Sequence, residues 1–260
     1  MQPTPSRRQV LQGCACLGLG GLLGGRWAGY AQAADKPPAA PAMQALEAAP
    51  GCWYVEGLSA LGSPANQNFI SNAGFIVTST SVVVVDALGS PALAERLLAE
   101  IARVTDKPVS HVIVTHYHAD HVYGLQVFAD RGIPILAHQA GREYLHADTA
   151  RLRLQASREE LAPWINDKTR LVPATQWVDG RQELTVGDTV IVLQPVGPAH
   201  TPEDLAVYLP QRKVLYAGDL VFRSRIPFVG QADSRSWILS LDKLLAFDTR
   251  VIVPGHGPVS

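Results

Sequence analysis

The sequence predicts an α/β fold in which two β-sheets are sandwiched between helices. From about residue 53 onward, short β-branched and apolar segments alternate with segments of helical periodicity. No long polar break divides this stretch, and no short-period repeat suggests a solenoid. The 260 residues are enough for one large globular domain. We therefore expect a single domain built from layered helices and strands.

The first half of this stretch has the signals of a sheet covered by helices. Strands are expected at 53–58, 74–78 and 82–87, the last containing four consecutive valines that suit only a buried strand. Ser90-Pro91 begins a helix, because Ser caps a helix and Pro fits its first turn. The apolar residues of that helix recur at helical spacing. A buried strand at 109–115, a polar loop and a helix at about 122–130 follow.

The second half repeats this alternation. The elements expected there are a strand at 133–137, a charged helical segment at 142–161, and strands at 176–178, 183–185 and 189–195. They continue with a hairpin of 205–209 and 213–217, a helix at 236–247 and a strand at 251–253.

The N-terminal segment has the features of an export signal. Arg7 and Arg8 precede an apolar, Gly-rich run at 13–25, and Ala31-Gln32-Ala33 offers a small-x-small cleavage site. The run is shorter than the roughly 20 residues that span a bilayer, so a cleaved twin-arginine signal is favoured over an uncleaved anchor. We expect a signal at 1–33, a Pro- and Ala-rich linker at 34–52, the folded domain at 53–260, and a periplasmic protein without stable membrane insertion.

Composition restricts the chemistry that the domain can carry. With 22 basic and 23 acidic residues, the chain has no basic field for a phosphate backbone, so nucleic-acid binding is not expected. Three cysteines are too few for a disulfide framework or a Cys-rich zinc site. Any metal must be held by carboxylates and by the eight histidines.

The loop after the strand at 109–115 carries an unusual density of metal-binding side chains. His116 and His118 point to the same side of an extended loop, because side chains there alternate with a period of two. Asp120 and His121 follow as immediate neighbours and point elsewhere. This spacing suits two metals side by side, and the imidazole and carboxylate donors favour zinc before iron or manganese.

Three further candidate ligands follow apolar strands. His200 follows the strand at 189–195, Asp219 the strand at 213–217, and His256 the strand at 251–253. Loops that leave the ends of neighbouring strands can converge on one edge of a sandwich, so these residues can complete a site with the histidine cluster.

These motifs resemble those of the metallo-β-lactamase superfamily. THYHADHVYG, Thr115 to Gly124, resembles its T-H-x-H-x-D-H-x-x-G signature, and His200, the AGD at Asp219 and the GHG at His256 follow in the family's order. Val85-Asp86 resembles its early strand-end acid. The resemblance covers residue 53 to the C-terminus and implies a four-layer αβ/βα sandwich with two metals. It implies one ion on His116, His118 and His200, a second on Asp120, His121 and His256, a bridging Asp219, and an Asp86 that orients a ligand.

Two cations in such a site favour hydrolysis of a small-molecule substrate. Zinc can bring the pKa of a bound water to about 7, which makes hydroxide available at neutral pH. We expect this metal-bridged hydroxide to attack an ester, thioester, lactone or amide-type carbonyl, with Asp120 as the catalytic residue that orients it. Tyr117 and Tyr123 are candidates for the mouth of the site, and Arg223 and Arg225 for a substrate carboxylate.

Several alternatives stay open at this point. The export signal and the AGDLVF motif resemble the periplasmic hydrolases associated with sulfur-oxidation and quinoprotein systems, whose substrates the resemblance does not supply. Dedicated β-lactamases of the superfamily carry Cys at the Asp219 position or lack an acid there, whereas this sequence has Asp and no nearby Cys. The resemblance therefore argues against dedicated β-lactam turnover, and β-lactamase, as a main or side activity, stays an alternative. An iron-dependent persulfide dioxygenase using Fe²⁺ and a zinc-sequestering binding protein are the other two alternatives. The sequence makes no prediction of oligomeric state.

Overall fold

The computed structural model describes residues 40–260. The predicted signal at 1–33 and its twin arginine lie outside the described residues. Within the described part of the chain, no helix combines the length and the apolar character needed to cross a bilayer.

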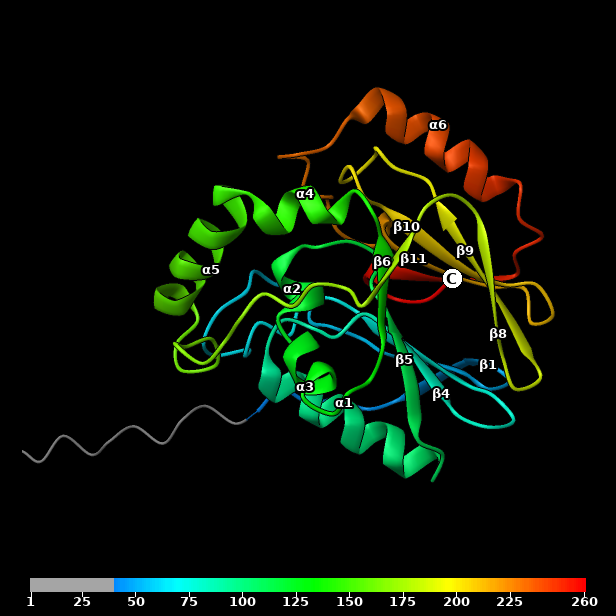
Figure 1. The fold of residues 1–260 in the computed structure, drawn as a ribbon, viewed down its shortest axis with the longest axis horizontal. Helices are drawn as coiled ribbons and strands as arrows, with labels where there is room; N and C mark the ends of the chain where they lie inside the picture. The colour runs from blue at the N-terminus through cyan, green and yellow to red at the C-terminus, as the bar shows by residue number, and fades with distance from the viewer. Residues whose placement is uncertain (1–39) are drawn as a thin grey trace, which may run out of the picture. The chain divides into compact units, whose positions relative to one another are not determined.

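Twelve strands form two sheets (Figure 1). The first sheet contains β1 (Leu46–Ala49), β2 (Cys52–Val55), β3 (Ala73–Val77), β4 (Val82–Val85), β5 (Val109–Ile113), β6 (Ile135–His138) and β7 (Gln176–Val178). The second contains β8 (Gln182–Val186), β9 (Thr189–Pro195), β10 (Leu205–Leu209), β11 (Val214–Phe222) and β12 (Val251–His256). The helices are α1 (Pro91–Val104), α2 (Ala119–Val122), α3 (Leu125–Ala129), α4 (Gly141–His146), α5 (Asp148–Glu160) and α6 (Ser234–Leu245).

The strand order brings several carboxyl ends of strands to one edge. The first sheet runs β1 to β7 in sequence order, and its strands from β4 to β7 are parallel. The second sheet has the order β12-β11-β10-β9-β8, with β11 and β12 parallel. Parallel neighbours end at the same edge of a sheet, so the loops after β4 and β5, and the ends of β11 and β12, can contribute to one site.

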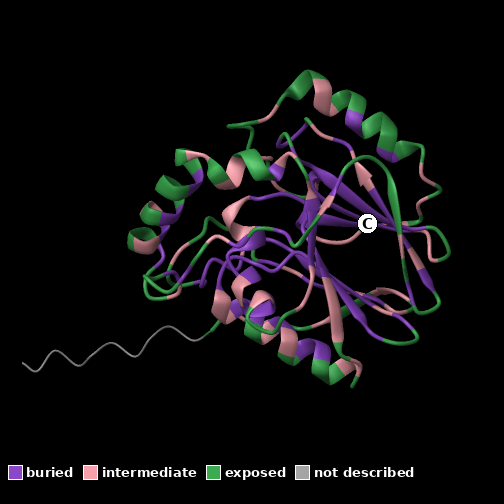
Figure 2. Ribbon diagram, in the orientation of Figure 1, coloured by how far each residue is buried: buried purple, intermediate pink, exposed green. Residues whose placement is uncertain are grey.

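The four valines of β4 show how the layers are made. Val82 and Val84 belong to the core between the first sheet and its helices, whereas Val83 and Val85 belong to the core between the two sheets. All four are buried because the strand is covered on both faces. Burying one such side chain contributes about 1.5–3 kcal/mol. Figure 2 shows the buried residues concentrated in the strands and the exposed ones on the outer helices.

Helices cover the outer face of each sheet. On the first sheet, α1 packs Leu93, Leu97 and Ile101 into the same cluster as β4. Its N-terminus is capped as expected, since the Ser90 hydroxyl accepts a hydrogen bond from the Leu93 amide (3.3 Å). On the second sheet, α6 contributes Trp237 and Leu244 to the outer cluster. This confirms the expected mixed α/β sandwich of two sheets between helices.

The folded part begins before the predicted boundary at residue 53. Leu46–Ala49 forms β1 and pairs with β2, with Leu46 opposite Tyr54, inside the segment predicted as a linker. Met43 and Ala45 also pack against the core. The short segment LEAA has little intrinsic β preference, so its strand results from pairing with β2 and not from a local signal.

Three other elements differ from expectation. The helix predicted at 122–130 is two short helices, α2 and α3, separated at Tyr123 and Gly124. The helical segment at 142–161 is divided into α4 and α5 by the extended backbone of Ala147. β11 continues to Phe222, so Asp219 lies within a strand whose pairing becomes irregular at Gly218.

Candidate metal centre

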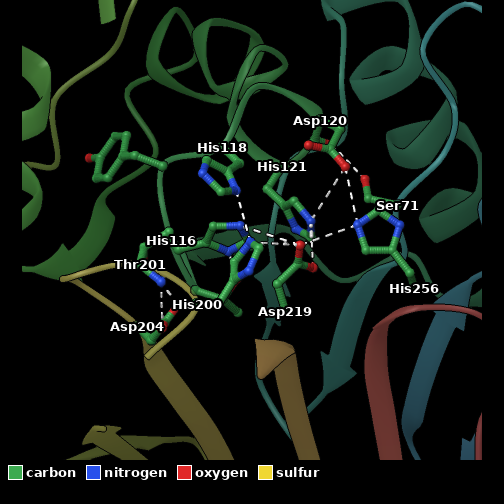
Figure 3. Close-up of polar contacts among 12 residues, drawn as sticks. Ser71, His116, His118, Asp120, His121, His200, Thr201, Asp204, Asp219 and His256 are labelled. Carbon is green, nitrogen blue, oxygen red and sulfur yellow. Dashed lines mark hydrogen bonds and ion pairs between the residues drawn. The ribbon is translucent and has the colours of Figure 1, made fainter. Parts of the chain in front are cut away.

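The seven candidate ligands predicted from the sequence meet at one edge of the sandwich (Figure 3). They form two groups, and within each group the ligand atoms all lie within 4.8 Å of one another. The first group contains His116, His118, His200 and Asp219, and the second contains Asp120, His121 and His256. The structure therefore brings together residues that are up to 140 positions apart (116 to 256) in the chain.

The first group places three imidazole nitrogens close to one carboxylate. Nδ1 of His118 lies 2.9 Å from Nε2 of His200. Oδ2 of Asp219 lies 3.1 Å from the same His200 nitrogen and 3.7 Å from Nε2 of His116. Three imidazole nitrogens thus face one carboxylate oxygen, which is a donor set that suits a tetrahedral metal.

Asp219 also reaches the second group. Its Oδ1 lies 3.1 Å from Nε2 of His121, and its Oδ2 lies 3.3 Å from Nε2 of His256. Oδ2 of Asp120 lies 3.3 Å from the same nitrogen of His256. One carboxylate therefore faces ligand atoms of both groups, as a bridging ligand must.

A short helix separates the two ligand pairs of the HxHxDH segment. His118 has an extended backbone and caps the N-terminus of α2, so Asp120 and His121 lie in a helical turn and not in the extended loop expected from the sequence. This change in backbone direction after His118 sends the two pairs toward different groups. The two pairs diverge as expected from the sequence, but the cause is the turn of helix at Asp120 and His121.

The second ring nitrogen of four histidines has a polar partner on the protein. Nδ1 of His116 lies 3.1 Å from the hydroxyl of Thr115, and Nε2 of His118 lies 3.1 Å from Oε1 of Gln231. Nδ1 of His121 lies 2.8 Å from Oδ2 of Asp86, and Nδ1 of His256 lies 2.7 Å from the carbonyl oxygen of Ile70. Each partner can accept a hydrogen bond from the N–H of the imidazole ring, which leaves the other ring nitrogen free to bind a cation.

Asp86 anchors this arrangement behind His121. Besides the His121 contact, it accepts hydrogen bonds from the Thr115 amide (2.8 Å) and the Thr115 hydroxyl (2.7 Å). Its backbone has φ of +63°, a conformation that Asp tolerates better than most residues. The end of β4 thus orients the loop after β5 without itself reaching the ligand groups.

Two glycines allow the strands of the second sheet to approach. A Cβ on Gly218, whose φ is +53°, would lie 2.6 Å from the Thr115 hydroxyl. A Cβ on Gly255 would lie 2.0 Å from Oδ1 of Asp219. The Gly of AGD and the first Gly of GHG are therefore required for the ligands on β11 and β12 to meet the loop after β5.

Several residues that no sequence motif identifies also hold the backbone of the site in place. Asn72 donates through Nδ2 to the carbonyls of Pro254 (2.9 Å) and Gly257 (2.8 Å), on either side of His256. The Ser71 hydroxyl donates to the backbone carbonyl of Asp120 (2.5 Å). The only local signal is Thr201-x-x-Asp204 after His200, where Asp204 accepts from the Thr201 amide (2.8 Å) and hydroxyl (2.9 Å).

Burial and charge shift the pKa values of the cluster in opposite directions. Burial, and then the charge of His121, lowers the pKa of His116 well below its usual value. Burial also opposes the charged form of His256, but Asp219 and Asp120 outweigh it and raise the pKa of His256 to about 9. His121 and His256 overcome the burial of Asp219 and hold its pKa well below its usual value. The carboxylates are thus balanced by imidazolium protons that a divalent cation would displace.

The orphaned polar atoms of the cluster fit a bound cation. Nε2 of His116, Nε2 of His121 and Oδ1 of Asp219 are buried and have no hydrogen-bond partner within the described chain. Leaving such groups unpaired is costly, and all three face the ligand groups. A divalent cation in each group would satisfy them, so the residues present fit the metals that their chemistry suggests.

A cavity of about 670 Å³ opens over the two ligand groups. Its floor includes His118, Asp120, Asp219 and His256. Two arginines, Arg153 and Arg225, line the cavity. Large apolar side chains form most of the remaining wall, and these are Leu61, Ile70, Phe222, Ile226, Pro227 and Phe228. The cavity is of a size that accepts a small-molecule ligand.

The structure corrects three of the four residues predicted to bind substrate. Tyr117 and Tyr123 are almost fully buried in the core beneath the helices, and Tyr144 lines the cavity in their place. Arg223 donates to the carbonyl of Val259 and does not line the cavity. Arg225 does line it, with Nη1 3.1 Å from Nδ1 of His256. An aromatic residue beside a buried strand usually packs inward, which explains both tyrosines.

Comparison with known proteins places these features in one family. The family model described as Metallo-beta-lactamase superfamily matches residues 67–256. The chain is 27% identical over 216 residues to the linear primary-alkylsulfatase of Pseudomonas sp. (strain ATCC 19151), covering 69% of this chain and 40% of that protein. It is 29% identical over 194 residues to the metallo-beta-lactamase type 2 of Bacillus sp. (strain 170), covering 73% of this chain and 67% of that protein. The chain thus spans less than half the length of the first relative and about two thirds of the second.

Solved structures share the fold. A metallo-beta-lactamase from Pontibacter korlensis superposes with a TM-score of 0.64 at 21% identity, covering 84% of this chain and 93% of that one. The metallo-beta-lactamase IND-7 gives a TM-score of 0.66 at 21% identity, covering 84% and 90%. At this level of identity the likeness concerns the fold alone.

Proposed function

The chain belongs to the metallo-beta-lactamase superfamily, and from this membership and its His/Asp cluster we propose that it is a dinuclear zinc hydrolase. The substrate class we propose is a small molecule with an ester, thioester, lactone or amide-type carbonyl. One observation carries the proposal: seven ligand side chains form two groups, and Asp219 faces ligand atoms of both. A mononuclear site would use only one of these groups and would not explain why the second is formed beside it.

Zinc is the metal that the donor set supports best. All the donors are imidazole nitrogens and carboxylate oxygens, and no thiolate takes part. We propose that His116, His118 and His200 hold one ion, that Asp120, His121 and His256 hold the other, and that Asp219 bridges them. When bound, such ions lower the pKa of water from about 15.7 to about 7 and polarise a carbonyl oxygen.

Asp120 is the residue we propose to orient the attacking water. Its carboxylate lies at the floor of the cavity, and its backbone carbonyl is fixed by the Ser71 hydroxyl. Oδ2 points toward His256, while His121 and His256 hold the pKa of Asp120 below its ordinary range, although burial alone would raise it. A carboxylate that stays ionised can accept a hydrogen bond from water throughout the neutral pH range.

The walls of the cavity determine what can approach the metals. Apolar side chains surround the floor and limit the access of bulk water to the reacting group. We propose that Arg225, which lines the wall beside His256, pairs with a negatively charged part of the substrate. Asp86, through His121 and Thr115, keeps the ligand geometry fixed while substrate enters.

We also propose that the protein acts in the periplasm. The twin-arginine signal at 1–33 predicts export to the periplasm, with cleavage after Ala33. Expression of the full chain, followed by fractionation and N-terminal sequencing of the mature protein, tests it. Mature protein in the periplasm beginning at Ala34 supports the proposal, and protein that stays cytoplasmic or membrane-bound contradicts it.

The decisive experiment combines metal analysis with a substrate panel. Protein purified from its own compartment should contain two zinc ions per chain by mass spectrometry and should hydrolyse members of an ester, thioester, lactone and β-lactam panel. One iron per chain, with oxygen uptake on a persulfide, would instead support the dioxygenase alternative. Two zinc ions without hydrolysis of any member would favour a zinc-sequestering protein. β-Lactams belong in the panel because two relatives bear the name metallo-beta-lactamase type 2.

A further inference from the structure

Exposed apolar side chains gather around one part of the second sheet. Most of the large apolar residues that are exposed in the described part of the chain lie between residues 226 and 245, in the loop after β11 and on α6. Ile226 is 90% exposed and Ile238 64% exposed. Figure 2 shows α6 largely in the colour of exposed residues. Such a concentration on a folded domain usually marks a binding surface.

Part of this surface is hollowed into a groove between the loop and α6. The groove has a volume of about 410 Å³, and Ser234 is the one polar residue in its lining. The lining residues are Leu220, Phe222, Pro227, Val229, Ser234, Trp237, Ile238 and Leu241.

The pattern of α6 explains how one helix can serve both the core and the groove. Trp237, Ser240 and Leu244 face the second sheet, where the Ser240 hydroxyl donates to the carbonyl of Val196 (2.5 Å). Ser234, Ile238 and Leu241 recur at spacings of four and three residues, and all three line the groove. Beside Ser234, the helix thus turns two apolar side chains, Ile238 and Leu241, toward the groove, and neither belongs to the cluster that packs on the second sheet.

The groove adjoins the cavity over the metal ligands. Phe222 and Pro227 line both hollows. Phe222 also stacks on His256, with ring centroids 4.9 Å apart, so the shared wall reaches the candidate ligands. The two hollows thus meet at Phe222 and Pro227, and an apolar chain attached to a group over Asp120 and Asp219 would have to cross these two residues to enter the groove.

We propose that the groove binds the linear acyl chain of the substrate, so that the preferred substrates are long-chain esters or thioesters. This rests on the proposed hydrolase function for the reacting end of the molecule. The occupant is inferred from two observations, the shared wall with the cavity and a lining that offers a ligand almost no polar partner. A second protein copy would need only the outer surface and would not explain why the groove adjoins the cavity.

Chain-length dependence tests the groove directly. We expect the affinity of the metal-loaded protein for linear alkanoates, from butanoate to dodecanoate below their micelle concentrations, to rise about threefold to fourfold per added methylene. Isothermal titration calorimetry measures this without any turnover. The kcat/KM for 4-nitrophenyl esters of the same acids should rise in parallel.

Neighbouring residues of α6 provide a matched pair of variants. Ile238→Asp introduces a charge into the groove, whereas Leu239→Asp changes a side chain that is 60% exposed and does not line it. We expect Ile238→Asp to weaken decanoate binding by more than about tenfold, because the bound alkyl chain would cover the exposed carboxylate and remove part of its hydration. Leu239→Asp should bind decanoate as the unmodified protein does, and neither variant should alter acetyl ester hydrolysis. Val229→Asp, at the opposite wall, should repeat the Ile238 result.

The outcomes separate this proposal from the proposed function. Acetyl ester hydrolysis with no dependence of affinity or kcat/KM on chain length would overturn the groove and leave the hydrolase intact. Chain-length-dependent binding without hydrolysis of any ester would support the groove and contradict the hydrolase. Equal losses in Ile238→Asp and Leu239→Asp, accompanied by dissociation of an oligomer in sedimentation, would show a subunit interface and overturn the proposal.

Discussion

Nε2 of His118 lies 3.1 Å from Oε1 of Gln231, so a residue of the loop over the cavity sets the orientation of a candidate metal ligand. The Gln231 amide oxygen accepts the Nε2 proton, which leaves Nδ1 of His118 directed toward His200. The same loop contributes Ile226 and Phe228 to the wall of the cavity. One segment of chain therefore both lines the cavity and contacts a candidate metal ligand.

Gln231→Ala should weaken metal binding without affecting the fold. The residue is exposed, so the loss should be near the lower end of the tenfold to hundredfold range typical of partners of ligating histidines, about tenfold. Competition with a chromophoric chelator measures it. Gln231→Glu keeps an acceptor at the same position and should retain the affinity; equal weakening in both variants would show that the contact does not act through His118.

Asp219→Ala should remove the bridge between the two groups. Its carboxylate faces nitrogens of His121, His200 and His256, so its loss should lower the affinity for at least one ion by more than about tenfold. Metal content by mass spectrometry and turnover on the best substrate of the panel are the measurements. Circular dichroism should show the same secondary structure as the unmodified protein. Unchanged metal content together with unchanged turnover would contradict the dinuclear assignment.

Asp86→Asn should destabilise the metal-free protein. The Asp86 carboxylate accepts three hydrogen bonds, from the amide and hydroxyl of Thr115 and from His121, whereas an amide places a donor against at least one of these groups. We expect a loss of about 1.5–3 kcal/mol in the free energy of unfolding, the range for hydrogen bonds to a charged group. Urea unfolding in the presence of a chelator measures it. The positive φ of Asp86 suits Asn equally well, so backbone strain does not contribute to the difference.

Metal affinity should increase with pH. Asp219 and Asp120 raise the pKa of His256 to about 9 against the effect of burial, so a cation must displace its proton at any lower pH. The apparent affinity should therefore rise by up to about tenfold per pH unit for each displaced proton and level off above the pKa. Titrations at pH 6, 7 and 8 in buffers of different ionisation enthalpy measure the protons released. Affinity that does not change over this range would contradict a protonated His256 in the metal-free protein.

The same raised pKa predicts the pH dependence of the metal-free fold. A histidine whose pKa is higher in the folded state stabilises the fold fully below its ordinary value of 6.5 and loses that contribution as the pH rises through about 9. The metal-free protein should thus become easier to unfold between these two values, while the metal-loaded protein should not. Thermal unfolding with and without chelator across this range compares them.

The sequence predicted most of the strands and the residues that the structure brings together as candidate ligands, because both depend on local patterns. The four valines of β4, the HxHxDH spacing and the small residues around Asp219 and His256 are readable without a partner strand. The contacts of Asn72 with Pro254 and Gly257 could not be predicted from the sequence, because they join positions that are 182 and 185 residues apart. The turn of helix after His118 was missed for a related reason, since four residues carry too little periodicity to reveal a helix.

The contacts of Asn72 determine when a metal site can exist during folding. One side chain joins the segment before β3 to the backbone on both sides of His256 and also accepts a hydrogen bond from the Gly57 amide (3.0 Å). The ligands themselves come from both sheets, so neither sheet alone carries a complete set. On the proposed assignment, uptake of the full set of ions would therefore require that β12 has docked, and bound metal would count only the chains in which both sheets have come together.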